Sequence, residues 1–153
     1  MDSKPIKFLL LGESNTGKSS FANLSKNNID NILPTVGVDI VINSTNLDLN
    51  KINMIYYDLS GNPRFFNIAD VYIKNSDAII IFFDVSNRST FEYINFIFKK
   101  IKNYNKKIFV IANKTDKKSV IAYDEYYNFC KKNNFFLIEN SNLNIDIYNE
   151  TLK

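Results

Sequence analysis

Residues 12–19 read Gly12-Glu13-Ser14-Asn15-Thr16-Gly17-Lys18-Ser19 and fit the pattern G-x-x-x-x-G-K-[ST]. Before this stretch, residues 6–11 are an apolar run bounded by proline and glycine, which predicts a buried strand. We expect a helix to begin at Lys18. A loop of this pattern between a strand and a helix indicates a P-loop, which binds phosphate groups.

Each part of this loop has a physical role. Its glycines let the backbone wrap a phosphate chain, and the loop and helix N-terminus direct N–H groups toward it. Lys18 would supply positive charge to the β- and γ-phosphates, and the Ser19 hydroxyl would ligate magnesium. The sequence therefore predicts a nucleotide site with Mg²⁺.

Outward from the loop, strands and helices alternate. Residues 39–47 and 51–57 alternate apolar with polar side chains around a turn, which predicts a hairpin and the one antiparallel pair. Residues 78–84 and 107–112 are apolar runs typical of central parallel strands. We expect helices from a cap at Ser89 or Thr90 to about residue 103, over 123–133 and over 145–152, and a last strand over 135–139. This order predicts a three-layer α/β fold, a mostly parallel sheet of about six strands with one antiparallel edge strand, as one domain over 1–153.

A second polar motif follows the strand at 107–112. It reads Asn113-Lys114-Thr115-Asp116. A carboxylate at Asp116 can accept two hydrogen bonds from the N1–H and exocyclic amine of guanine, which adenine does not offer. Placed beyond a later strand end of the same sheet, the motif predicts that the nucleotide is GTP or GDP.

Composition excludes several other classes of protein. The chain has 153 residues and a formal charge of +3, and its paired lysines are typical of solvated faces rather than of a nucleic-acid surface. Cys130 is alone, so no internal disulfide forms, and no secretory signal or apolar run long enough for a bilayer is present. We expect a cytoplasmic protein, peripheral to membranes only through partners, and a monomer.

Taken together, these motifs resemble those of small GTPases of the Ras superfamily, and the form Gly-Glu-Ser-x-x-Gly-Lys-Ser-Ser is most similar to the Rab branch. Pro34-Thr35-Val36-Gly37 resembles the first switch segment of that family, and Asp58-Leu59-Ser60-Gly61 resembles the D-x-x-G motif that opens the second. Residues 83–86 and 89–91 are similar to the family's fourth strand and third helix start. The resemblance covers nearly the whole chain in the right order.

The resemblance implies a role for each matching residue. Thr35 would coordinate magnesium and the γ-phosphate, Asp58 would hold magnesium through its water shell, and the Gly61 N–H would bond the γ-phosphate. Lys18, Thr35, Gly61 and Asn62 are the candidate catalytic residues. The candidate nucleotide-binding residues are Ser14, Asn15, Thr16, Gly17, Lys18, Ser19, Ser20, Pro34, Thr35, Gly61, Asn113, Lys114, Asp116, Ser141 and Asn142, and the candidate metal ligands are Ser19, Thr35 and Asp58.

The chain departs from the family at the residue after D-x-x-G. That residue is usually a glutamine that orients the attacking water, and here it is Asn62, one methylene shorter. Pro63 biases Asn62 away from helical backbone and stiffens the loop. We expect slow hydrolysis, with a working substitution through backbone shifts as the alternative.

Other departures lie at the edges of the nucleotide and at the end of the chain. Asn28 stands where the family has an aromatic residue that packs against guanine, and Asn142 and Leu143 replace two residues of the E-x-S-A-K element that contains Ser141. The sequence ends at Lys153 without the prenylated cysteines of Rabs, so no autonomous lipid anchor is expected. Two alternatives remain open: a soluble relative without this tail, or a tail that is missing from the sequence.

Two classes of function remain. The first is a switch that cycles between GTP and GDP and meets effectors, exchange factors or GTPase-activating proteins through the segments from Ile32 to Asp39 and from Pro63 to Tyr72, in vesicle traffic or signalling. The second is a GTP-binding module that scarcely hydrolyses and acts as a constitutive partner or decoy in a Rab network. A P-loop kinase lacks support, because no lid or acceptor motif is present and Asp116 would have no role.

Overall fold

The computed structural model describes residues 4–23, 35–47 and 50–140. Its strands are β1 (Ile6–Gly12), β2 (Val38–Leu47), β3 (Asn50–Leu59), β4 (Ala78–Asp84), β5 (Lys107–Asn113) and β6 (Phe136–Asn140). Its helices are α1 (Lys18–Ala22), the 3₁₀ helix η1 (Pro63–Ile68), α2 (Ala69–Asn75), α3 (Arg88–Ile101) and α4 (Tyr123–Lys132). The predicted alternation of strands and helices is confirmed for these residues.

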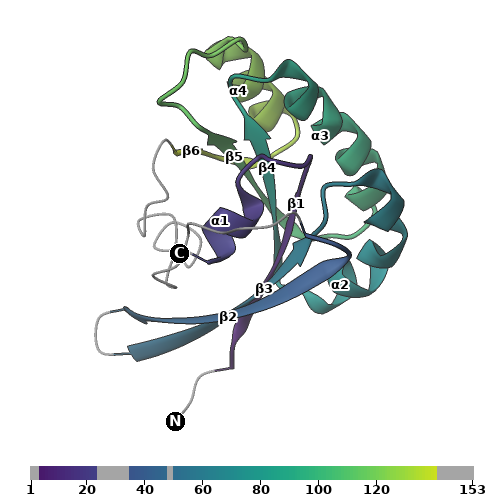
Figure 1. The fold of residues 1–153 in the computed structure, drawn as a ribbon, viewed down its shortest axis with the longest axis vertical. Coiled ribbons are helices and arrows are strands. Elements are labelled where there is room, and N and C mark those ends of the chain that lie inside the picture. The colour runs from purple at the N-terminus through teal and green to yellow at the C-terminus, as the bar shows by residue number, and fades with distance from the viewer. Residues whose placement is uncertain (1–3, 24–34, 48–49, 141–153) are drawn as a thin grey trace.

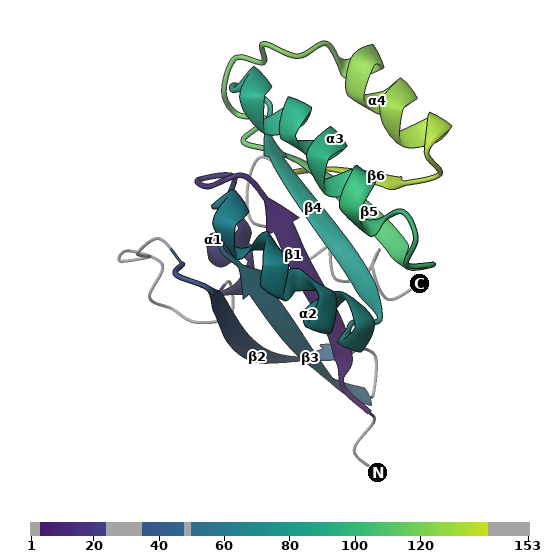
Figure 2. The ribbon, with the colours of Figure 1, turned by 90° about the vertical axis from the view of Figure 1, so that its right-hand side faces the viewer.

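The strands form one sheet in the order β2-β3-β1-β4-β5-β6, and only the edge strand β2 pairs antiparallel. The sheet separates α1 on one face from α2, α3 and α4 on the other (Figures 1 and 2). The predicted three-layer α/β fold with one antiparallel edge strand is therefore confirmed. All parallel strands end at the same edge of the sheet, where their following loops meet.

Period-two alternation along the strands divides the core into two clusters. Leu9 and Leu11 of β1 lie in the cluster under α2, α3 and α4, whereas Phe8 and Leu10 lie in the cluster under α1. β4 is buried at every position, and its residues 78–83 are all apolar, so the strand shows no alternation with polar residues before Asp84. The core thus fixes β1 and β4, from which the loops of the site extend.

The structure differs from the sequence-based expectations in three elements. The N-cap of α3 is Asn87, whose side chain accepts the Ser89 backbone N–H, so the expected cap at Ser89 or Thr90 was wrong. The helices η1 and α2 were not foreseen. The predicted final helix over 145–152 lies outside the described residues.

Among the described parts of the chain, no helix combines the length and the apolar character needed to cross a membrane.

Candidate functional site

The P-loop follows the carboxyl end of β1 and leads into α1 (Figure 1). Gly17 adopts φ +100, a left-handed conformation, and a Cβ atom there would lie 2.2 Å from Nδ2 of Asn113. That amide donates to the Thr16 carbonyl at 2.8 Å, so the P-loop packs directly against the end of β5. Glycine is required at this position by both backbone conformation and close approach.

A cavity of about 330 Å³ lies against the P-loop. Its walls are the predicted site residues Ser14, Asn15, Gly17, Lys18, Ser19, Ser20, Thr35, Gly61 and Lys114, together with Ser60. Ser60 was missed, although it stands between two predicted residues of the D-x-x-G motif, because its position in that motif carries no fixed residue type. Segments far apart in sequence thus converge on one space.

The three predicted metal ligands form a cluster beside this cavity. The Ser19 hydroxyl donates to Oδ2 of Asp58, and the Thr35 hydroxyl lies 3.2 Å from the same oxygen and 3.1 Å from Ser19. Asp58 is buried, and its other oxygen, Oδ1, has no hydrogen-bond partner within the described part of the chain. Burial raises the pKa of Asp58, while hydrogen bonds and the Lys18 charge oppose this.

This donor set fits magnesium. Mg²⁺ prefers oxygen ligands, and an unpartnered buried carboxylate oxygen is energetically unfavourable unless a cation, a water or a donor reaches it. Two hydroxyls and one carboxylate therefore provide the chemistry that a hydrated Mg²⁺ ion uses in nucleotide sites.

Lys18 is held against the backbone of its own loop. Its ammonium donates to the carbonyls of Gly12 and Glu13, each at 2.9 Å. Burial lowers the pKa of Lys18 to about 8, and the nearby carboxylates of Asp58 and Glu13 limit the shift. A buried ammonium of this kind strongly favours an anionic ligand that supplies opposite charge.

The two predicted switch segments approach each other at the cavity. The Ser60 N–H donates to the Gly37 carbonyl at 2.8 Å, which links the segment after Thr35 to the start of the second segment. Gly61 packs against the P-loop so closely that a Cβ atom on it would lie 2.2 Å from the Ser14 nitrogen. Thr35 and Gly61 therefore both line the P-loop cavity.

Asn62 has extended backbone, with φ −76 and ψ 124, as expected for a residue before proline. Its side-chain Oδ1 accepts the Arg64 backbone N–H at 3.1 Å and so caps η1. Asn62 does not line the cavity of the P-loop. It lines an adjoining space between η1 and α3, which shares Ser14 and Gly61 with the P-loop cavity and is also bounded by Tyr93 and Phe96.

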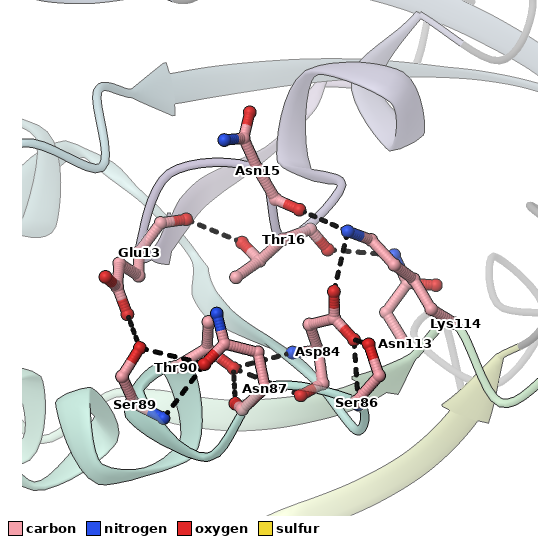
Figure 3. A network of polar contacts seen from close by, with 10 residues as sticks. All are labelled: Glu13, Asn15, Thr16, Asp84, Ser86, Asn87, Ser89, Thr90, Asn113 and Lys114. Carbon is pink, nitrogen blue, oxygen red and sulfur yellow. Dashed lines mark hydrogen bonds and ion pairs between the residues drawn. The ribbon is translucent and has the colours of Figure 1, made fainter. Parts of the chain in front are cut away.

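The loop after β5 carries the predicted base-reading motif. Lys114 donates to the Asn15 carbonyl at 2.6 Å and pairs with Asp84 at 2.7 Å. Asp116 is exposed, within a turn closed by the Lys117 N–H and the Lys114 carbonyl at 2.9 Å. Asp84 was missed by sequence reasoning because it belongs to another strand end and meets Lys114 only in the fold (Figure 3).

Several predicted positions lie outside the described residues. These are Pro34, Ser141 and Asn142 of the nucleotide site, Asn28, and the part of the first partner segment before Thr35.

Comparison with known proteins gives a consistent result. The model of the Ras family matches residues 7–153. Rab-18 of Caenorhabditis elegans is 31% identical over 146 residues, which cover 89% of this chain and 70% of that protein. Human Rab-19 is 35% identical over 116 residues, which cover 72% of this chain and 54% of that protein. RABC1 of Arabidopsis thaliana is 32% identical over 120 residues, which cover 74% of this chain and 57% of that protein.

The chain therefore belongs to the Ras family of small GTPases. Within that family it is a divergent, Rab-like member. The matched region spans only about half to two thirds of the length of most of these curated relatives.

Proposed function

We propose that this chain is a guanine-nucleotide-dependent switch that binds GTP and GDP with Mg²⁺ and hydrolyses GTP slowly. The observation that carries the proposal is the meeting of Ser19, Thr35 and Asp58 beside the P-loop cavity, with Oδ1 of Asp58 buried and lacking a partner among the described residues. Such an arrangement of oxygen ligands next to a phosphate-binding loop suits a nucleotide–magnesium complex.

Binding would use charge and backbone donors at one end and base recognition at the other. Lys18 and the N–H groups of the P-loop would hold the phosphates, since the lysine is buried and its ammonium faces only carbonyl oxygens and more distant carboxylates. Asp116 would accept the guanine N1–H and amine, because its carboxylate is exposed beyond the β5 strand end.

Ser19, Thr35 and Asp58 would hold the magnesium ion. The chemistry that the ion supplies when bound is neutralisation of negative charge on the phosphate oxygens. These ligands come from three segments: Ser19 lies on α1, Asp58 lies near the end of β3 and Thr35 precedes β2. Binding of the ion would therefore hold the three segments together.

The switch would depend on contacts that only a triphosphate satisfies. Thr35 and Gly61 line the P-loop cavity, and the hydrogen bond from Ser60 to Gly37 couples their two segments. Loss of the γ-phosphate would remove the attachment of both segments, which then separate from the P-loop together.

Slow hydrolysis follows from the position of Asn62. Its side-chain Oδ1 accepts the Arg64 N–H, and Asn62 is not among the residues that line the cavity around Lys18 and Ser19. To orient a water, Asn62 would have to give up this cap, and its shorter side chain would still place the amide too far back. A misplacement of about 1 Å of a group that orients the reacting water costs about a hundredfold in rate.

The segments around the switches offer a surface for protein partners. Val36, Ile40 and Ile42 are 80%, 59% and 67% exposed, and Val71, within the second segment, is 59% exposed. Exposed apolar side chains gathered near a nucleotide-dependent element suit effectors, exchange factors or activating proteins. Through such partners the protein would act peripherally at membranes, in vesicle traffic or signalling.

The test combines binding and turnover on one sample. Nucleotide-free protein is titrated with GDP and GTPγS, with and without Mg²⁺, and GTP hydrolysis is then followed in a single turnover. We expect tight, magnesium-dependent binding and a slow but measurable rate. Binding without any turnover would favour the alternative, a hydrolysis-deficient partner or decoy in a Rab network. Failure to bind would leave the fold as a scaffold for protein contacts.

A further inference from the structure

The turn that joins β4 to α3, residues 84–90, touches both loops of the nucleotide site (Figure 3). Asp84 at the end of β4 pairs with Lys114 of the loop after β5, and Ser89 in the first turn of α3 donates to Glu13 of the P-loop at 3.1 Å. None of the residues in this turn was expected to have a role at the site.

Asp84 is held in one orientation. Its Oδ1 accepts the backbone N–H of Ser86 at 2.9 Å and the Ser86 hydroxyl at 2.6 Å, which leaves Oδ2 for Lys114 at 2.7 Å. Although burial works in the opposite direction, these hydrogen bonds and the Lys114 charge lower the pKa of Asp84, so it is ionised at neutral pH. A fixed, charged carboxylate is therefore aimed at the lysine.

The backbone conformation of Lys114 is unfavourable, so contacts with the rest of the protein must hold it. Both Lys114 and its partner Asn15 adopt left-handed conformations, with φ 60 and φ 63. Such conformations in residues other than glycine persist only where surrounding contacts hold them. The lysine ammonium joins the Asp84 carboxylate to the Asn15 carbonyl, and so it ties the base loop, the P-loop and the β4 end at one point.

Of the ion pairs between described residues, this one is the best shielded. The side chains of Asp84 and Lys114 are 9% and 26% exposed, whereas those of Arg88 and Glu125 are 41% or more. Removal of one partner from a shielded pair leaves the other charge uncompensated, which costs more than the same change in an exposed pair.

We propose that Asp84 is a positioning residue for nucleotide retention, which holds Lys114 so that the base loop and the P-loop stay closed together over the bound guanine nucleotide. The inference rests on the proposed function. Asp84 touches no nucleotide itself, and its effect is on the rate of release.

The experiment measures dissociation of a fluorescent GDP analogue from wild type and from Asp84→Asn in excess unlabelled GDP. The variant keeps the shape and the acceptor for Ser86 but loses the charge. We expect release to be about tenfold faster, since a hydrogen-bonded charged partner is lost, with little change in the association rate. Asp124→Asn makes the same chemical change at an exposed carboxylate of α4 and should release at the wild-type rate.

A double-mutant cycle separates positioning from a general loss of structure. In a Lys114→Met background, Asp84→Asn should accelerate release by less than about threefold, because the two changes remove one interaction. Independent, multiplicative effects would overturn the proposal, as would an unchanged release rate in Asp84→Asn. If that variant does not fold, Ser86→Ala, which weakens the hold on the same carboxylate, should accelerate release by about two- to threefold, and an unchanged rate would again overturn it. Wild type that binds no GDP would instead refute the proposed function.

Discussion

Asn62 is the residue whose chemistry is most open to test by one substitution. Asn62→Gln lengthens the side chain by one methylene, so its amide no longer has the length of the side chain that caps η1. We expect single-turnover GTP hydrolysis to rise about ten- to hundredfold, because the amide can then reach the water. Asn62→Ala serves as the comparison and should hydrolyse no faster than wild type. A rate for Asn62→Gln equal to that of wild type would show that another group limits the reaction.

Gly61 is constrained by space rather than by backbone conformation. A Cβ atom at this position would lie 2.2 Å from the Ser14 nitrogen and 2.5 Å from the Glu13 carbonyl carbon. Gly61→Ala must therefore push the second switch segment away from the P-loop. Affinity for GTPγS should fall about tenfold or more, through loss of the γ-phosphate hydrogen bond.

The binding of GDP provides the control for Gly61→Ala, because GDP lacks the γ-phosphate. Calorimetric titration should show GDP affinity within about threefold of wild type. An equal loss for both nucleotides would mean that the substitution damages the P-loop itself, against the role assigned to Gly61.

At the scale of single elements, α3 is fixed at its start by Asn87. Its side chain accepts the Ser89 N–H at 3.1 Å, one of the otherwise unpaired donors of the helix. Asn87→Ala should lower the free energy of unfolding by about 1 kcal/mol in chemical denaturation. Asn95→Ala, at an exposed position inside the same helix, should leave stability unchanged or slightly raised, since alanine favours helices. Equal losses would argue against the cap.

The helix α4 packs a lone thiol into the core. Cys130 is 1% exposed, and burial raises its pKa to about 12. The pKa of the thiol is higher in the folded state than in the unfolded state. Its titration therefore leaves the free energy of unfolding unchanged until pH rises above about 9. Stability should then decline with further rise in pH.

Labelling with a thiol reagent tests this packing. At pH 8 without denaturant, Cys130 should react far more slowly than a free thiol, and reaction should follow the unfolding transition as denaturant is added. Cys130→Ala gives the unlabelled baseline. Rapid labelling of native protein would contradict the burial of this face of α4.

How far the sequence predicts these elements depends on the strength of each local pattern. The strands β1, β4 and β5 were foreseen because each is an apolar run between polar or glycine boundaries. The helices η1 and α2 were not, because their short segment begins with proline and its apolar and aromatic residues follow no clear period. The cap of α3 was misplaced because Asn87, Ser89 and Thr90 are all able to cap.

The residues of the candidate site likewise divide into those that local sequence patterns predict and those that they miss. Residues in contiguous motifs, such as Lys18, Ser19 and Asp58, were predicted because chemistry and spacing lie together in the sequence. Asp84 and Ser89 were not, since their contacts with Lys114 and Glu13 join residues distant in sequence and appear only when the strand ends meet. Tertiary pairing of this kind leaves no local pattern.

At the scale of the whole molecule, the sheet brings three strand ends to one edge and so assembles a cavity from segments spread over about 100 residues, from Ser14 after β1 to Lys114 after β5. Asp58 is buried and Ser19 and Thr35 are half-buried, whereas Asp116 is exposed. In the proposed function one carboxylate, Asp116, recognises guanine by accepting two hydrogen bonds, and an amide in its place would offer one donor and one acceptor.

The most direct measurement is the calorimetric titration of wild type and Asp116→Asn with GDP, ADP and xanthosine diphosphate in magnesium. Wild type should bind GDP and neither of the others. The affinity of Asp116→Asn for GDP should fall by at least about a hundredfold, and the variant should bind xanthosine diphosphate. The reason is that its amide donates to the carbonyl that replaces the guanine amine. Wild type that binds ADP as well as GDP, or Asp116→Asn with unchanged preference, would contradict a guanine-specific switch.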